Sequence, residues 1–89
     1  MNNHFPVIGQ IVISKAGRDQ GKIYLVVGKR EDNKLLLADG RDRVLAHPKV
    51  KNCRHLKILH SIVEGVTDTG KVTDLTIRAA LAKISPDKL

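Results

Sequence analysis

The chain has 89 residues and a formal net charge of +7, from 16 Lys and Arg against 9 Asp and Glu. At this length we expect one domain with a small core, because only about 60% of the unfolded surface is buried on folding. No apolar run of about 18 residues and no leader pattern is present, so we expect neither a membrane span nor a secretory signal. The single cysteine, Cys53, cannot form an internal disulfide, which suits the cytoplasmic location that we expect.

The positive charge is concentrated in the first two thirds of the chain. Residues 1–60 contain twelve Lys or Arg and five Asp or Glu, whereas residues 61–89 contain four of each. Clustered cations favour a polyanionic partner, because counterions released on contact drive the binding. A basic surface that only maintains solubility would have the same composition, so charge alone leaves both interpretations open.

Short β-strands are predicted for the first half of the chain. Gly9 interrupts the first strand, and the second is almost continuously apolar and rich in Val and Ile. A polar turn at 31–33 precedes the third strand, and the hairpin dipeptide Asp39-Gly40 precedes the fourth. Short strands separated by frequent turns indicate a small barrel. The predicted strands are residues 7–14, 23–28, 34–38 and 41–46.

The amino-acid composition of the chain changes after residue 46. Residues 47–57 are basic and contain Pro48, which favours an extended segment or a last edge strand over the barrel. Residues 61–72 contain a short apolar patch followed by a loop signal. We therefore divide the chain into a barrel with a basic extension at 1–60 and a loop with a helix at 61–89.

An amphipathic helix is predicted for about residues 73–84. Thr73 can cap it, Asp74 lies in its first turn, and Pro86 would end it. We expect its apolar stripe to dock on the barrel or on a partner, because an isolated helix of this length is marginal in water. The stripe consists of Ile77, Ala80, Leu81 and Ile84.

A basic loop between the first two strands is the main candidate for a binding site. Gly17 and Gly21 serve as structural turn residues, because glycine reaches positive φ without steric cost. We expect this loop and the basic segment 47–57 to form one positive strip, with a solvated basic strand that has no partner as the alternative. The candidate RNA-binding residues are Lys15, Arg18, Lys22, Arg41, Arg43, Lys49, Lys51, Arg54, His55 and Lys57.

The sequence favours contact with phosphate over stacking on bases. Phe5 and Tyr24 are the only aromatic residues, and core packing is the simpler explanation for both. Readers of single strands stack bases on exposed aromatic rings, whereas Lys and Arg recognise phosphate and shape. Among these cations arginine is favoured, because its planar fork matches a phosphate group.

Metal-binding and catalytic interpretations are not supported by the spacing of the candidate residues. The loop that begins at Gly17 has three residues between its glycines, and Ile23 stands where a nucleotide-binding P-loop needs Ser or Thr. No orienting group can be inferred beside Cys53 and His55 for nucleophilic catalysis. We therefore expect a non-enzyme without metal or cofactor. The potential zinc ligands, which lack paired spacing, are His47, Cys53, His55 and His60.

Residues 9–27 resemble the KOW motif of ribosomal and transcription-elongation proteins. The loop Ser-Lys-Ala-Gly-Arg-Asp-Gln-Gly-Lys at 14–22 is most similar to stand-alone bacterial KOW-domain RNA-binding proteins, which resemble a large-subunit ribosomal protein family of archaea and eukaryotes. The resemblance covers roughly residues 7–57. It implies an SH3-like barrel whose hairpin contacts ribosomal or other structured RNA, with Gly17 as the central glycine of the motif.

Two functions remain open at this point. The first is a monomeric, non-catalytic RNA-binding protein on ribosomal RNA, with no membrane contact. The second is motivated by the apolar face of Ile77, Leu81 and Ile84 together with the neutral charge of residues 61–89, and the resemblance allows it, since KOW modules also bind proteins. It is an interaction module that docks on the ribosome or on a translation or transcription factor, through a barrel edge or the C-terminal helix.

Overall fold

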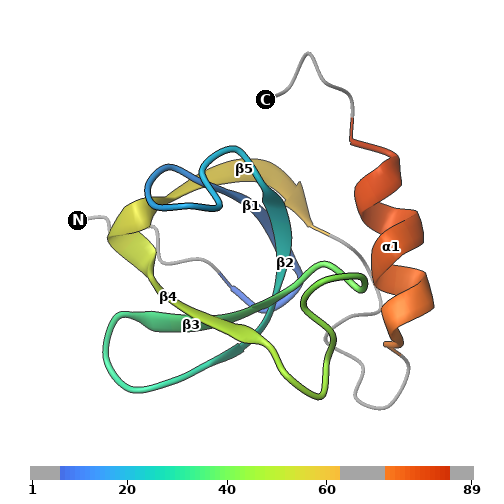
Figure 1. Ribbon diagram of the computed structural model, residues 1–89, viewed down its shortest axis with the longest axis horizontal. Helices are drawn as coiled ribbons and strands as arrows, with labels where there is room; N and C mark the ends of the chain where they lie inside the picture. The colour runs from blue at the N-terminus through green and yellow to red at the C-terminus, as the bar shows by residue number, and fades with distance from the viewer. Residues whose placement is uncertain (1–6, 63–71, 85–89) are drawn as a thin grey trace.

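The described part of the chain folds into a curled antiparallel sheet and one α-helix (Figure 1). The computed structural model describes residues 7–62 and 72–84. The sheet is a half-barrel of five strands in the order β4-β3-β2-β1-β5. Within the described residues, no helix has the length and apolar character needed to cross a membrane. The elements are β1 (Gln10–Ser14), β2 (Ile23–Lys29), β3 (Lys34–Ala38), β4 (Lys49–Asn52), the 3-10 turn η1 (Cys53–His55), β5 (Leu56–Ile62) and α1 (Asp74–Ala82).

The predicted strands agree with the structure in the first half of the sheet. β3 occupies the predicted residues, and β2 is one residue longer than expected. β1 begins only at Gln10, because Gly9 has a φ of +96° and breaks the extended backbone before it. The edge strand expected within 47–57 is confirmed as β4, and the same segment also enters β5.

The predicted fourth strand at 41–46 is wrong, because these residues form part of a loop between β3 and β4. The backbone N–H groups of Arg41 and Arg43 donate to Asp39 Oδ1 at 2.9 and 2.8 Å. The N–H of Leu45 donates to Asp74 Oδ1 at 2.8 Å. Because carboxylate oxygens accept from these N–H groups, the groups do not need hydrogen bonds to a neighbouring strand.

The sheet is buried on both faces, which explains the continuous apolar character of β2. Along β2 the alternating side chains enter two different clusters, one inside the half-barrel and one under α1. Tyr24 is 1% exposed and belongs to the inner cluster, as the core interpretation predicted, whereas Phe5 lies outside the described residues. The inner cluster is Val12, Tyr24, Val26, Leu35, Leu37 and Leu56, and the outer cluster is Ile11, Ile13, Leu25, Ala38, Leu59 and Ile77.

Helix α1 packs on the barrel of its own chain. Thr73 is its N-cap, and a capping box joins the Thr73 and Thr76 side chains to the backbone N–H groups of each other. Ile77 is 1% exposed, and Leu81 and Ile84 pack against the same cluster, so the predicted stripe is used within the molecule. The helix ends at Ala82, two residues before the predicted end at 84, and Pro86 lies outside the described residues.

The loop between β3 and β4 ties the sheet to α1. The Arg78 guanidinium donates to the Gly40 carbonyl at 2.7 Å, next to the Asp74 contact described above. Gly40 is buried with a φ of +78°, and a Cβ at this position would collide with the Asp74 carbonyl oxygen. Glycine is therefore needed here both for its φ and for the close approach of loop and helix.

Candidate nucleic-acid interface

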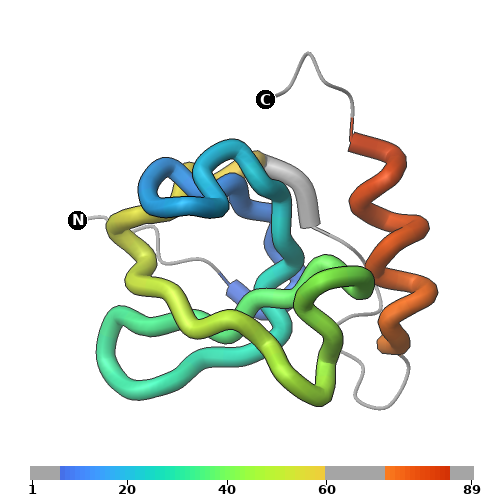
Figure 2. The backbone as a smooth tube through the Cα atoms, in the orientation of Figure 1, coloured from blue at the N-terminus to red at the C-terminus, as the bar shows by residue number. Residues whose placement is uncertain are grey.

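The loop between β1 and β2 is closed on itself and attached to η1. Ser14 donates its N–H to the Lys22 carbonyl, and Gly21 donates its N–H to the Ser14 carbonyl, both at 2.9 Å. Gly17 and Gly21 have φ values of +89° and +93°, which allow these reversals. The N–H of Lys15 donates to the His55 carbonyl at 2.7 Å. This bond holds the basic loop beside the 3-10 turn, and Figure 2 shows the two segments next to each other.

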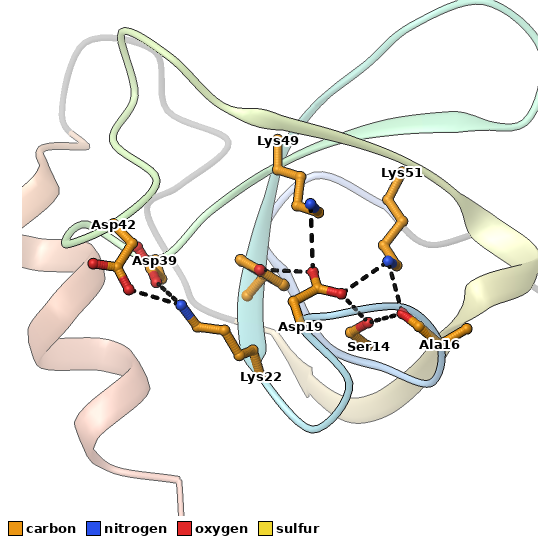
Figure 3. Close-up of polar contacts among 9 residues, drawn as sticks. Ser14, Ala16, Asp19, Lys22, Asp39, Asp42, Lys49 and Lys51 are labelled. Carbon is orange, nitrogen blue, oxygen red and sulfur yellow. Dashed lines mark hydrogen bonds and ion pairs between the residues drawn. The ribbon is translucent and has the colours of Figure 1, made fainter.

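The carboxylate of Asp19 is the centre of a polar cluster under this loop (Figure 3). Its Oδ1 accepts from the Ser14 hydroxyl at 2.8 Å and from Lys51 Nζ at 2.9 Å. Its Oδ2 accepts from the Tyr24 hydroxyl at 2.8 Å and lies 3.8 Å from Lys49 Nζ. The cluster thus joins the loop to β2 and β4, and it is nearly shielded from solvent, since the side chain of Asp19 is 10% exposed.

Both acidic groups of this cluster have shifted pKa values. Burial by itself would raise the pKa of Asp19, but hydrogen bonds from Lys51, Tyr24 and Ser14 outweigh it and lower the pKa well below its ordinary value. Burial, together with the neighbouring Asp19, raises the pKa of Tyr24. Asp19 is therefore a carboxylate at neutral pH, and Tyr24 is a phenol that donates to it.

A second ion-pair group surrounds Lys22 at the end of the same loop. Lys22 Nζ lies 2.8 Å from an Asp42 carboxylate oxygen and 3.5 Å from Asp39. The hydrogen bond to Asp42 is the main cause of the raised pKa of Lys22. For Asp39, burial would raise the pKa, but the N–H groups of Arg43 and Arg41 and the charge of Lys22 lower it.

The structure therefore divides the predicted cations by their partners. Lys22, Lys49 and Lys51 form ion pairs with acidic residues of the protein. Lys49 and Lys51 do lie beside the Gly17 loop as expected, and Lys51 Nζ also donates to the Ala16 carbonyl at 3.0 Å. Because their ammonium groups turn to Asp19, part of their positive charge is neutralised within the protein.

Four other predicted cations are exposed: Lys15 and Arg18 in the β1–β2 loop, Arg54 in η1 and Lys57 in β5. They have no side-chain hydrogen bond or ion pair within residues 7–62 and 72–84. The pairing of β1 with β5 places Lys57 opposite Ile13, next to the start of the loop, and η1 presents the half-buried His55. We call this group the exposed basic end: Lys15, Arg18, Arg54 and Lys57.

Arg41 and Arg43 occupy a different region. Both are exposed in the loop between β3 and β4, which lies beside α1 rather than beside η1 (Figure 1). Lys22, at the end of the β1–β2 loop, forms ion pairs with Asp39 and Asp42 of the β3–β4 loop (Figure 3). The structure thus brings together only part of the predicted RNA-binding set.

Sequence analysis did not identify Asp19 as the residue that forms ion pairs with Lys49 and Lys51. One local signal exists, because an aspartate in a turn accepts nearby hydrogen bonds, as Asp19 does from Ser14. Its bond to Lys51 joins residues 32 positions apart, and no local pattern reveals such a contact.

The exposed basic end can donate charge-assisted hydrogen bonds to phosphate oxygens from two separate segments of the chain. The chain matches no protein-family model, and no curated protein matches it. Its function must therefore be argued from the geometry and from the resemblance in its sequence.

Proposed function

We propose that this protein binds structured RNA, ribosomal RNA in particular, without catalysing a reaction. The observation that supports this most is the exposed basic end, where the β1–β2 loop and η1 are held together by the bond from Lys15 to His55. A phosphate backbone that crosses this end meets cations from the loop, from η1 and from β5. The resemblance of residues 9–27 to the KOW motif, and the SH3-like barrel that it implies, support the same proposal.

The rigidity of the loop also supports binding to a structured partner. Asp19 fixes the loop to β2 and β4, so little conformational entropy is lost when the loop binds. The described surface has no exposed Phe, Tyr or Trp for base stacking, since Tyr24 is buried. This site therefore suits structured RNA, whose phosphate groups have fixed positions, better than single-stranded RNA, which is bound by base stacking.

The alternative function, docking on a translation or transcription factor, has less support from the helix. Ile77 and the neighbouring apolar residues of α1 already pack on the sheet. An interaction through this stripe would require the helix to leave the barrel and expose its core. A version that uses a barrel edge has no such cost, but no particular contact favours it.

The proposal is tested by charge reversal at the exposed basic end. Equilibrium binding to purified ribosomal RNA is measured for the double variant Arg18→Glu/Arg54→Glu. We expect affinity to fall by at least about tenfold per position, because each change removes one phosphate contact and adds repulsion. Circular dichroism should show an unchanged fold, since both side chains are exposed and make no bond within the described residues.

Arg30→Glu is the matched control for this experiment. Arg30 is also exposed, but it belongs to the turn between β2 and β3 and to none of the three segments that carry the exposed basic end. We expect this variant to lose less than about threefold, through the change in net charge alone. Equal losses in Arg30→Glu and in the double variant, or no loss in the double variant, would refute the proposal.

A further inference from the structure

An open groove of about 350 Å³ lies between the loop that connects β3 to β4 and the second half of α1. This volume is at the lower end of the range of small-molecule sites. One wall is apolar and is formed by Ile23, Leu81 and Ala82. The rest of the lining is charged and consists of Lys22, Asp39, Arg41, Asp42 and Arg78, with Lys22 paired to both carboxylates.

The two guanidinium groups are available to an anion. Arg78 uses one of its five N–H donors on the Gly40 carbonyl, and this is its only hydrogen bond within the described parts of the chain. That bond fixes Arg78 next to the residue that precedes Arg41. Arg41 is exposed and has no side-chain partner among the described residues. Two arginines that line one groove and keep free N–H donors suit the oxygens of a phosphate.

The remaining groups of the groove suit a flat ring with polar groups at its edge. The side chains of Leu81 and Ala82 offer an apolar surface for one face of a ring. The carboxylate of Asp42 is 69% exposed; one oxygen accepts from Lys22, and the other can accept a hydrogen bond from an amino group of a base. A simple anion would leave the apolar wall unused, and an apolar ligand would leave the guanidinium groups unpaired.

We infer that this groove holds one unpaired nucleotide, with its phosphate on Arg41 and Arg78 and its base against Leu81 and Ala82. The inference rests on the proposed function, because the nucleotide would belong to the bound RNA. The groove is nevertheless separate from the exposed basic end, since none of Lys15, Arg18, Arg54 and Lys57 lines it. A nucleotide in the groove would give the protein one contact with an RNA base, in addition to the phosphate contacts of the exposed basic end.

The test is a titration of the full chain with adenosine monophosphate, followed by amide NMR at constant ionic strength. We expect saturable shifts confined to residues 22–23, 39–42 and 78–82, which include the lining of the groove. Adenosine alone and inorganic phosphate alone should each bind at least about tenfold more weakly, because each lacks one half of the contacts. Phosphate that binds as tightly as the nucleotide, or the absence of saturable shifts, would overturn the inference.

Arg41→Glu should weaken nucleotide binding by at least about tenfold, through loss of a charge-assisted hydrogen bond. The matched control is Arg43→Glu, because Arg43 is exposed in the same loop but does not line the groove. Equal losses in these two variants would count against the groove.

The double variant Arg18→Glu/Arg54→Glu separates this inference from the proposed function. It should bind adenosine monophosphate like the unaltered protein. If that variant loses ribosomal RNA while the unaltered protein fails to bind the nucleotide, the proposed function stands and the groove does not. If the nucleotide binds in the groove while ribosomal RNA binding is insensitive to the double variant, the proposed function falls.

Discussion

At the scale of single residues, Asp19 determines which lysines of the basic segments remain available to a partner. It accepts hydrogen bonds from Lys51 and Tyr24 and lies 3.8 Å from Lys49. The side chain of Lys51 is only 11% exposed, so removing Asp19 would leave a nearly buried ammonium group without its counter-charge, bonded to the Ala16 carbonyl. Asp19 thus lowers the available charge of the surface and at the same time orders the loop.

The pKa of Asp19 predicts a dependence of stability on pH. Because the folded protein holds this pKa below the ordinary value of about 3.9, the stabilisation is complete above that value and is lost as the pH falls further. The lowered pKa of Asp39 acts in the same direction. We expect Asp19→Asn to be less stable at neutral pH and to lose less of its unfolding free energy on acidification.

Urea unfolding between about pH 6 and about pH 2 measures this dependence. The control is Asp32→Asn, in the exposed turn between β2 and β3, where asparagine also tolerates the observed φ of +52°. If the unfolding free energy of Asp19→Asn falls on acidification as steeply as that of the unaltered protein, another group is responsible for the pH dependence.

The candidate site could be predicted from the sequence only in part. The loop between two apolar runs, with its cations and glycines, follows from local composition. The partners of Lys49, Lys51 and Lys22 do not, because each depends on how strands distant in the sequence are arranged. The sequence alone therefore identifies basic segments but not which of their charges face solvent.

At the scale of elements, strands were predictable where local pattern and tertiary packing agree. β3 satisfies both, since its apolar side chains alternate between the inner cluster and the outer face. The segment 41–46 has strand-like residues, but its N–H groups are taken by Asp39 and by Asp74 of the distant helix. That competition cannot be seen without the position of α1.

Gly40→Ala should weaken the contact between α1 and the β3–β4 loop. Its cost in unfolding free energy should exceed the cost of placing alanine at a positive φ alone. The substitution adds a collision with the Asp74 carbonyl oxygen to the strain of a φ of +78°. Gly21→Ala is the matched control, because Gly21 has a φ of +93° but no atom within 4 Å of the added Cβ.

We expect Gly21→Ala to cost about 1 kcal/mol of unfolding free energy and Gly40→Ala at least about 1 kcal/mol more. Amide hydrogen exchange should also show faster exchange in α1 for Gly40→Ala only. Equal costs with unchanged protection of the helix would mean that loop and helix are not in close contact.

At the scale of the whole molecule, the net charge of +7 is divided among regions with different roles. Some cations stabilise the fold through Asp19, Asp39 and Asp42. Others remain exposed at the end formed by the β1–β2 loop and η1, and Arg41 lies at the groove beside α1. Only the exposed cations can release counterions from a nucleic acid, so the effective charge of the binding surface is smaller than the composition suggests.

The salt dependence of binding to ribosomal RNA tests this account most directly. With contacts from Lys15, Arg18, Arg54 and Lys57, the logarithm of the association constant should fall linearly with the logarithm of salt concentration, with a slope of roughly −3. Arg18→Gln should reduce the magnitude of that slope by about one. An affinity that is the same at about 50 and about 200 mM salt would contradict phosphate recognition by the exposed basic end.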